Sequence, residues 1–303
     1  MRNKILEIYN LILDYLIYKN LKKRFKNYSS TYPKIAGRMF DVISLKILLK
    51  GRFENDELLC LKNSVFEKID SKSKSALDIG ANIGNHSLFF ADYFNKVFAF
   101  EPLTKNYELL ELNIKLKNNI SAYNLGGSNK DEINKIYTPL NFDSGHSKIP
   151  NDKTFMDTEK ENFQSEEVKL KRLDDFVIKE KINNIKFIKI DVEGYEYKVL
   201  QGVEKLLKNE KPVVAFEQFP IDFIDQSSKS INFLKKNDYK YFYEPSFFKR
   251  RKSKNKFISA LYKILFLFNF IFNKKNNYKL ELISNFEIKD YPMIIASVKD
   301  LNA

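Results

Sequence analysis

The chain has 303 residues, of which 44% are hydrophobic and 15% aromatic, so it can bury a sizeable core and is not intrinsically disordered. The net charge of +13 is concentrated in two segments: residues 1–50 carry 11 Lys/Arg against 3 Asp/Glu, and residues 246–280 carry 10 Lys/Arg and no acid. The mildly acidic middle argues against nucleic-acid binding, which favours a basic surface around the active site. The single Cys60 excludes an internal disulfide and has no zinc-ligand set around it, which indicates a reducing compartment.

The first predicted element is a helix over residues 4–26 that ends in a basic cluster. Glu7 and Asp14 interrupt its apolar run and no cleavage site follows, so it is neither a signal peptide nor a membrane span. The simplest expectation is a helix packed on the domain, and attachment to a membrane or a partner is the alternative. We assign residues 1–50 to an N-terminal helical extension.

The rest of the chain, 51–303, is predicted to be one α/β domain with a Rossmann-like, mostly parallel, seven-stranded sheet and helices on both faces. Strands alternate with helices along it, which is typical of a doubly wound sheet with an antiparallel edge. Its core spans about 75–245. The expected strands are 75–79, 96–101, 120–125, 185–192, 213–217, 239–243 and 293–298, with short additional strands near 133–137 and 168–170.

A basic and apolar insertion covers about 246–290, before the last strand at about 293–298. Its centre joins the basic residues 249–256 to the apolar stretch 257–272. Sixteen helical residues span about 24 Å, less than the roughly 30 Å of a bilayer core. We expect either a packed helix or a peripheral contact of 249–272 with an anionic membrane, and a protein that is cytoplasmic or peripheral at the inner face of the membrane.

A glycine turn follows the first core strand, in the stretch Asp78-Ile79-Gly80-Ala81-Asn82-Ile83-Gly84. An acid, Glu101, ends the next strand, and together they form the skeleton of a nucleoside-cofactor site. The third glycine of a dinucleotide motif is missing. S-adenosylmethionine fits better. Gly80 would let backbone approach its amino-acid tail, Asp78 would orient its ammonium directly or through water, and Glu101 would accept its ribose hydroxyls.

These motifs occur in order with others, and together they resemble the FkbM-type methyltransferase family. The further motifs are Phe100-Glu101-Pro102, Leu173-Asp174-Asp175-Phe176, Lys189-Ile190-Asp191-Val192-Glu193-Gly194-Tyr195-Glu196, Val199-Leu200-Gln201-Gly202 and a strand ending in Glu217. The resemblance covers roughly 75–217. It implies a class I fold, S-adenosylmethionine bound by Asp78, Gly80, Asn82, Gly84 and Glu101, and O-methylation, often of sugar hydroxyls in glycoconjugates or of natural products.

Methyl transfer to a hydroxyl requires in-line geometry and removal of a proton. Asp191 ends the central strand, where doubly wound sheets bind ligands, and Glu193 follows it, so both are candidate catalytic residues. A helix cap or an ion pair with Lys189 is the structural alternative for Asp191. The base could also be His86 or His146, with His146 preferred because a loop could close over the acceptor. No metal site is predicted, although Asp191 and Glu193 could share a divalent cation.

The leading hypothesis is therefore an S-adenosylmethionine-dependent O-methyltransferase that acts on a sugar of a surface glycan or glycolipid. A nucleic-acid or other small-molecule methyltransferase is an alternative, but the chain has no Asn-Pro-Pro-Tyr motif and no Pro-Cys nucleophile. A nicotinamide-dependent sugar oxidoreductase would require the missing glycine.

Overall fold

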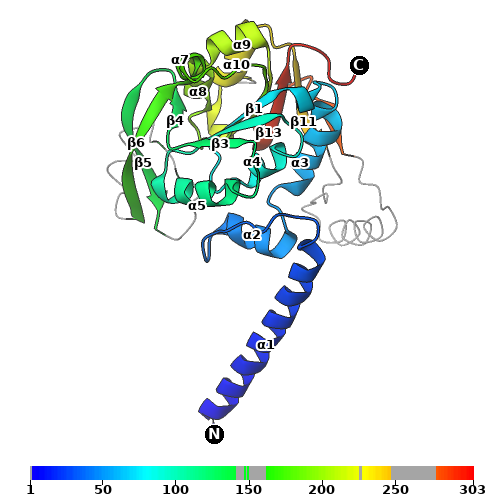
Figure 1. Cartoon of the computed structure of the whole chain (residues 1–303), viewed down its shortest axis with the longest axis vertical. Helices are drawn as coiled ribbons and strands as arrows, with labels where there is room; N and C mark the ends of the chain where they lie inside the picture. The colour runs from blue at the N-terminus through cyan, green and yellow to red at the C-terminus, as the bar shows by residue number, and fades with distance from the viewer. Residues whose placement is uncertain (1, 141–146, 148, 150–161, 225–226, 247–277) are drawn as a thin grey trace.

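The computed structural model describes residues 2–140, 147, 149, 162–224, 227–246 and 278–303. The expected centre of the insertion at 249–272 and the candidate base His146 lie outside these residues. Figure 1 shows an α/β body from which one long helix projects.

The body is built on an eight-stranded sheet in the order β12-β11-β13-β8-β7-β1-β2-β3. The five strands from β8 to β3 run parallel, and β13, β11 and β12 extend the sheet with antiparallel pairs. The strands are β1 (Ser75–Ile79), β2 (Lys96–Phe100), β3 (Ile120–Tyr123), β7 (Ile185–Ile190), β8 (Val213–Gln218), β11 (Tyr241–Ser246), β12 (Lys279–Leu282) and β13 (Tyr291–Ser297).

Helices cover both faces of this sheet, as the alternating sequence pattern predicts (Figure 1). One face packs on an apolar cluster that includes Val199, Leu207 and Leu234, and the other on a cluster that includes Leu61 and Phe90. The helices are α2 (Val42–Lys50), α3 (Asn55–Leu61), α4 (Asn85–Phe90), α5 (Thr104–Ile114), α7 (Leu173–Lys179), α8 (Glu196–Gly202), α9 (Glu204–Glu210) and α10 (Lys229–Lys236), with short turns η1 (Lys62–Phe66), η2 (Ser71–Ser73) and η5 (Pro220–Asp222).

Two small sheets accompany the main one. β4 (Gly126–Ser128), β6 (Phe163–Arg172) and β5 (Glu132–Pro139) form a three-stranded sheet, and β9 (Phe223–Ile224) pairs with β10 (Ser227–Ser228). The predicted fold class and all seven strand positions are confirmed, but the main sheet has an eighth strand. This strand, β12, lies inside the segment 246–290 that was assigned to the insertion. It pairs with β11 and so forms the edge of the main sheet.

The N-terminal helix α1 (Arg2–Tyr28) differs from the simplest expectation, because it does not pack on the domain along its length. Its large apolar side chains are exposed from Leu6 to Tyr18, and it meets the body at its C-terminal end, next to α2 (Figure 1). Of the helices in the described ranges, none combines the length and apolar character needed to cross a membrane.

The glycine turn after β1 is fixed by the neighbouring strand β7. Gly80 has φ +81°, and a Cβ built on it would lie 1.8 Å from the backbone oxygen of Asp191. Only glycine allows both the left-handed backbone and this close approach. The turn that was expected to approach a ligand is therefore, first of all, packed against the end of β7.

Replacing Gly80 by alanine should destabilise the protein by about 3–5 kcal/mol, because a left-handed alanine and a steric clash add together. Gly194 is the matched control: its φ is +93°, yet a Cβ there would meet nothing within 4 Å. Gly194→Ala should cost only about 1–2 kcal/mol. Urea unfolding of both variants measures the difference, and equal losses would contradict the role of the Gly80–Asp191 contact.

Candidate active site

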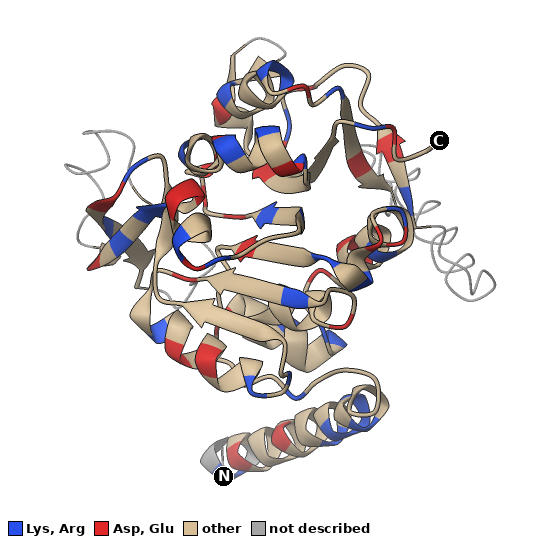
Figure 2. Cartoon of the chain, turned by 45° about the horizontal axis from the view of Figure 1, so that its top comes forward, with Lys and Arg blue, Asp and Glu red and all other residues tan. Residues whose placement is uncertain are grey.

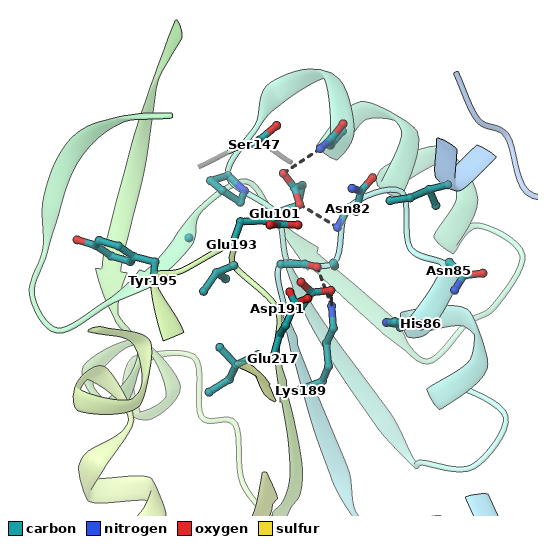
Figure 3. A pocket seen from close by; sticks show the side chains of 18 of the residues that line it. Asn82, Asn85, His86, Glu101, Ser147, Lys189, Asp191, Glu193, Tyr195 and Glu217 are labelled. Atoms are coloured by element: carbon teal, nitrogen blue, oxygen red, sulfur yellow. Dashed lines mark hydrogen bonds and ion pairs between the residues drawn. The ribbon is translucent and has the colours of Figure 1, made fainter. Parts of the chain in front are cut away.

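A cavity of about 250 Å³ opens at the carboxyl ends of the parallel strands, where β1, β2, β7 and β8 finish. Parallel sheets bind ligands at this edge because the loops that follow adjacent strands meet there. Residues from four strand ends line the cavity (Figure 3). The helix α2 contributes Val42, Ile43 and Lys46. The cavity has two chemically different parts.

The first part surrounds Glu101, which follows β2. One carboxylate oxygen accepts the backbone N–H of Asn82 at 2.8 Å and the other accepts that of Leu103 at 3.0 Å. Asn106 donates its amide N–H to the same side chain at 3.4 Å. These bonds hold Glu101 rigidly against the glycine turn. Oε2 keeps one lone pair for a ligand hydroxyl, whereas Oε1 already accepts two bonds, of which the long one from Asn106 can be exchanged for a ligand donor.

Burial raises the pKa of Glu101 to about 7, even though the N–H groups of Leu103 and Asn82 pull it down. The side chain is only 4% exposed, so its charged form loses most of its hydration. A ligand that donates hydrogen bonds to the carboxylate would favour the charged form, and ligand binding would then depend on pH near neutrality.

Two amide oxygens in this part of the cavity have no hydrogen-bond partner among the described residues. They belong to Asn82 and Asn106, and both residues line the cavity. A buried acceptor without a partner costs free energy, so both oxygens are suited to receive donors from a ligand. Asn106 is 1% exposed and was missed by the sequence analysis, since one asparagine on a predicted helix carries no signal.

Asp78 and Lys189 form a buried ion pair at the floor of the cavity, which Lys189 lines and Asp78 does not. The Lys189 ammonium is 3.3 Å from Asp78 Oδ1 and 3.1 Å from Asp191 Oδ2, and it donates a hydrogen bond to the Gly80 carbonyl at 2.9 Å. Asp78 is fully buried, accepts a hydrogen bond from Ser87 and is not among the lining residues. Asp78 was expected to orient a ligand ammonium directly or through water; the structure instead gives it an indirect role through Lys189.

Opposite charges keep Lys189 protonated in this setting. Burial by itself lowers the pKa of an ammonium, but the charges of Asp191 and Asp78 raise the pKa of Lys189 above its usual value. The same ammonium lowers the pKa of Asp191 against the effect of burial. The ion pair given as the structural alternative for Asp191 is thus present, and it leaves this side chain ionised and facing the cavity (Figure 3).

The second part of the cavity is an acidic cluster formed by Asp191, Glu193 and Glu217. One carboxylate oxygen from each lies within 4.8 Å of the others. Burial and the charges of Asp191 and Glu193 raise the pKa of Glu217 to about 10. Glu217 therefore carries a proton at neutral pH and shares it with Asp191.

The loop after β7 aims these side chains. Glu193 has φ 53° and Gly194 has φ 93°, so the chain turns sharply after Asp191. Glu196 stabilises the turn by accepting the backbone N–H groups of Val192 and Gly194, each at 3.2 Å. α8 begins after Tyr195 without a side-chain cap, so the capping role that was considered for Asp191 is not observed.

His86 and His146 are the two histidines that were considered as the base. His86 lines the cavity at the start of α4, is 6% exposed and places Nε2 3.3 Å from Glu54 Oε2. Its charge would contribute to keeping Asp191 ionised. His146, the preferred base of the sequence analysis, lies outside the described residues, and its role stays a prediction.

The acidic cluster is also a set of oxygen ligands that could hold a divalent cation, since Mg²⁺ and Ca²⁺ prefer carboxylate oxygens. A cation bound there would displace the proton that Glu217 shares with Asp191.

Glu217 was recognised in the sequence only as part of a motif, with no role assigned to it. Its position at the end of a strand adjacent to the Asp191 strand was the signal that could have placed it in the site.

Comparison with known proteins gives one family match. The model described as "Methyltransferase FkbM domain" matches residues 78–241, which is more than half of the chain and includes every strand end that lines the cavity. No curated protein matches the chain significantly.

Several solved structures are similar to this chain at low sequence identity. A methyltransferase FkbM from Methylobacillus flagellatus KT is 16% identical, with a TM-score of 0.34 over 69% of this chain and 49% of that one. Precorrin-6y C5,15-methyltransferase from Geobacter metallireducens GS-15 is 12% identical, with a TM-score of 0.37 over 77% and 85%. Aeropyrum pernix fibrillarin, solved with S-adenosyl-L-methionine, is 8% identical, with a TM-score of 0.35 over 63% and 72%. The chain spans about half the length of the first of these proteins.

Replacing Lys189 by methionine should destabilise the protein by about 3–5 kcal/mol, because two carboxylates lose their buried counter-ion. Adding Asp78→Asn should recover at least about 1 kcal/mol of this loss. Lys186 on the same strand is the matched control. Its ion pair with Glu210 is partly exposed, and Lys186→Met should cost less than about 1 kcal/mol. Urea unfolding tests the set, and a double variant no more stable than Lys189→Met would contradict the coupling.

Proposed function

The chain belongs to the FkbM methyltransferase family, and from this premise we propose that it transfers a methyl group from S-adenosylmethionine to a hydroxyl group of a sugar, in a surface glycan or a glycolipid. The observation that carries the proposal is the arrangement of one cavity. A rigid carboxylate suited to a ribose lies at one end, and a cluster of carboxylates that can receive a hydroxyl and its proton lies at the other.

S-adenosylmethionine is the methyl donor, and the part of the cavity around Glu101 suits it. Oε2 of Glu101 can accept one ribose hydroxyl, and Oε1 can accept the other in exchange for its long bond from Asn106. The unpaired amide oxygens of Asn82 and Asn106 can accept further donors of the ligand. Gly80 lines the cavity, whereas Gly84 does not and shapes the turn from behind, where a Cβ would lie 2.8 Å from Leu110 Cδ1. We assign donor binding to Gly80, Asn82, Glu101 and Asn106, with Asp78 and Gly84 as supporting residues that do not line the cavity.

The acidic cluster supplies what the transfer requires on the acceptor side. A hydroxyl oxygen attacks the methyl carbon, the new C–O bond forms as the C–S bond breaks, and the hydroxyl proton must go to a base. Asp191 is ionised, faces the cavity and is 36% exposed on its side chain, so it can accept that proton. The products are a methyl ether, S-adenosylhomocysteine and one proton.

Glu193 and Glu217 complete the acceptor part. Protonated Glu217 can donate a hydrogen bond to a sugar oxygen or to Asp191, and Glu193 can accept one from a neighbouring hydroxyl. Such a mixed set of acceptors and one donor suits a neutral acceptor with several hydroxyls. It disfavours a nucleic acid, because the carboxylates would repel phosphates.

A divalent cation is the alternative way to activate the hydroxyl, and the same three carboxylates would hold it. Dialysis against EDTA separates the two mechanisms. Turnover that survives EDTA supports the shared proton, whereas loss that Mg²⁺ restores, with unchanged affinity for S-adenosylhomocysteine, would assign the cluster to a cation.

Asp191→Asn should lower turnover by about 10²–10⁴-fold, because the amide cannot accept the proton. Its affinity for S-adenosylhomocysteine should change less, since the donor binds at the other end of the cavity. The readout is the mass of surface glycans from a strain that lacks the gene and is complemented with each variant. Wild type and the surface control Asp175→Asn should restore one methyl group that Asp191→Asn does not, and full restoration by Asp191→Asn would contradict its role.

The affinity for S-adenosylhomocysteine should fall as the pH drops through about 7, where Glu101 becomes protonated in the free protein. Ribose hydroxyls donate hydrogen bonds and therefore favour the ionised carboxylate of Glu101. Below pH 7 the affinity should therefore fall by up to about tenfold per pH unit. Calorimetry across this range measures it. Glu101→Gln should bind more weakly and without this pH dependence, and the exposed control Glu108→Gln should behave as wild type. A Glu101→Gln variant that keeps the wild-type profile would refute the assignment.

A further inference from the structure

The helix α1 exposes an apolar surface that nothing in the described part of the chain covers. Ten large apolar side chains between Leu6 and Tyr18 are exposed, among them Leu11 at 71% and Leu16 at 57%. Figure 1 shows this half of the helix extending away from the body. Exposed apolar area of this extent marks an interaction site.

The polarity of α1 changes along its length. From Leu6 to Tyr18 only Glu7, Asn10 and Asp14 are polar, and their spacing of three and four places them on one stripe of the helix. The half nearest the body is basic instead, with Lys and Arg gathered there (Figure 2). Between Asp14 and Asp41 the chain has seven basic residues and no acid: Lys19, Lys22, Lys23, Arg24, Lys26, Lys34 and Arg38.

Tyrosines mark the boundary between the two halves. The Lys19 ammonium lies 5.3 Å from the ring centroid of Tyr15, and the Lys22 ammonium lies 5.8 Å from that of Tyr18. Tyrosine and lysine together are characteristic of the interface between lipid tails and headgroups, because each presents an apolar body and a polar end.

A groove of about 530 Å³ lies at the other end of α1, where this helix meets α2. It is lined mainly by apolar side chains, and Met39 and Phe40 at its edge are about four-fifths exposed. Leu45 and Leu48 of α2 are half exposed in the same groove. Its basic residues, Lys34 and Arg38, belong to the acid-free segment, so apolar contact and positive charge again occur together.

The length and charge of α1 argue against two other roles, a membrane-spanning helix and a dimer interface. The apolar half, 13 residues, spans about 20 Å, which is too short to cross a hydrocarbon core of about 30 Å. A parallel pair of α1 helices would place the two basic halves side by side, and an antiparallel pair would place each basic half against an apolar one. A second copy of the chain is therefore a poor partner.

We propose that α1 and the groove between α1 and α2 bind the surface of an anionic lipid bilayer. The apolar half of α1 enters the headgroup region and the upper acyl chains, with Glu7, Asn10 and Asp14 turned to water. The basic half remains among the anionic headgroups, and Met39, Phe40, Leu45 and Leu48 contact the same surface.

This contact would bring the catalytic cavity to the bilayer. The helix α2 lines the groove with Leu45 and Leu48 and lines the cavity with Val42, Ile43 and Lys46. Resting on the proposed function, the acceptor is then a lipid-linked sugar, whose hydroxyls reach the cavity while its lipid stays in the membrane. The membrane contact itself does not depend on the proposed reaction.

Sedimentation of the full chain with vesicles tests the proposal. Wild type should bind vesicles of phosphatidylcholine and phosphatidylglycerol more strongly than vesicles of phosphatidylcholine alone, and salt should weaken the binding. Lys22→Gln with Lys23→Gln and Lys26→Gln should lower the partition coefficient on anionic vesicles by at least about tenfold. Ile12→Gln with Leu16→Gln should do the same by removing apolar contact, while glutamine preserves the helix.

Two control variants carry the same types of substitution on the surface of the body, away from α1. Lys179→Gln with Lys229→Gln and Lys236→Gln removes three exposed charges, and Ile178→Gln with Leu282→Gln removes two exposed apolar side chains. Both should bind vesicles as wild type does. The proposal fails if the α1 variants bind vesicles as tightly as these controls, or if they abolish a dimer in light scattering and leave vesicle binding unchanged.

Calorimetry with S-adenosylhomocysteine keeps the two proposals apart. The α1 variants should retain wild-type affinity, which shows that the body is folded and that any loss on vesicles belongs to α1. If wild type binds vesicles but no S-adenosylhomocysteine, the proposed function fails and the membrane contact stands.

Discussion

The buried ammonium of Lys189 is the interaction on which the site depends. It neutralises Asp78 from β1 and Asp191 from β7, and it binds the carbonyl of Gly80 between them. Removing this charge would leave Asp78 without a partner in a dry interior, where a charge is costly, and would leave Asp191 without its counter-ion at the wall of the cavity. One side chain thus joins the turn that faces the donor to the group that faces the acceptor.

The cavity above Lys189 has two chemically different parts, one around Glu101 and one around Asp191 and Glu217. Around Glu101 the carboxylate is fixed by backbone N–H groups and ready to accept, whereas Asp191 and Glu217 hold one proton between them. The division follows from the sheet, because adjacent parallel strands deliver their end residues to one edge. The family supplies the reaction class, and this local electrostatics supports a hydroxyl as the acceptor.

The sequence predicted the sheet well because β1, β2, β7 and β8 are short apolar runs bounded by glycine, proline or an acid. It did not predict β12, whose pattern Lys279–Leu282 is too short and mixed to separate from the insertion. It placed Asp191, Glu193 and Glu101 at the right edge. It missed Asn106 and the burial of Asp78, since both depend on how α5 and β7 pack against the turn, which no local pattern encodes.

The contact between Gly80 and the carbonyl of Asp191 has a consequence for engineering. It ties the glycine turn, which we propose binds the donor, to the end of β7 so closely that neither backbone can be changed without displacing the other. The side chains of α2 that reach the cavity, Val42, Ile43 and Lys46, stand outside this contact. A library intended to change acceptor preference is therefore best confined to α2, where variation can reshape the entrance while the reaction geometry stays intact.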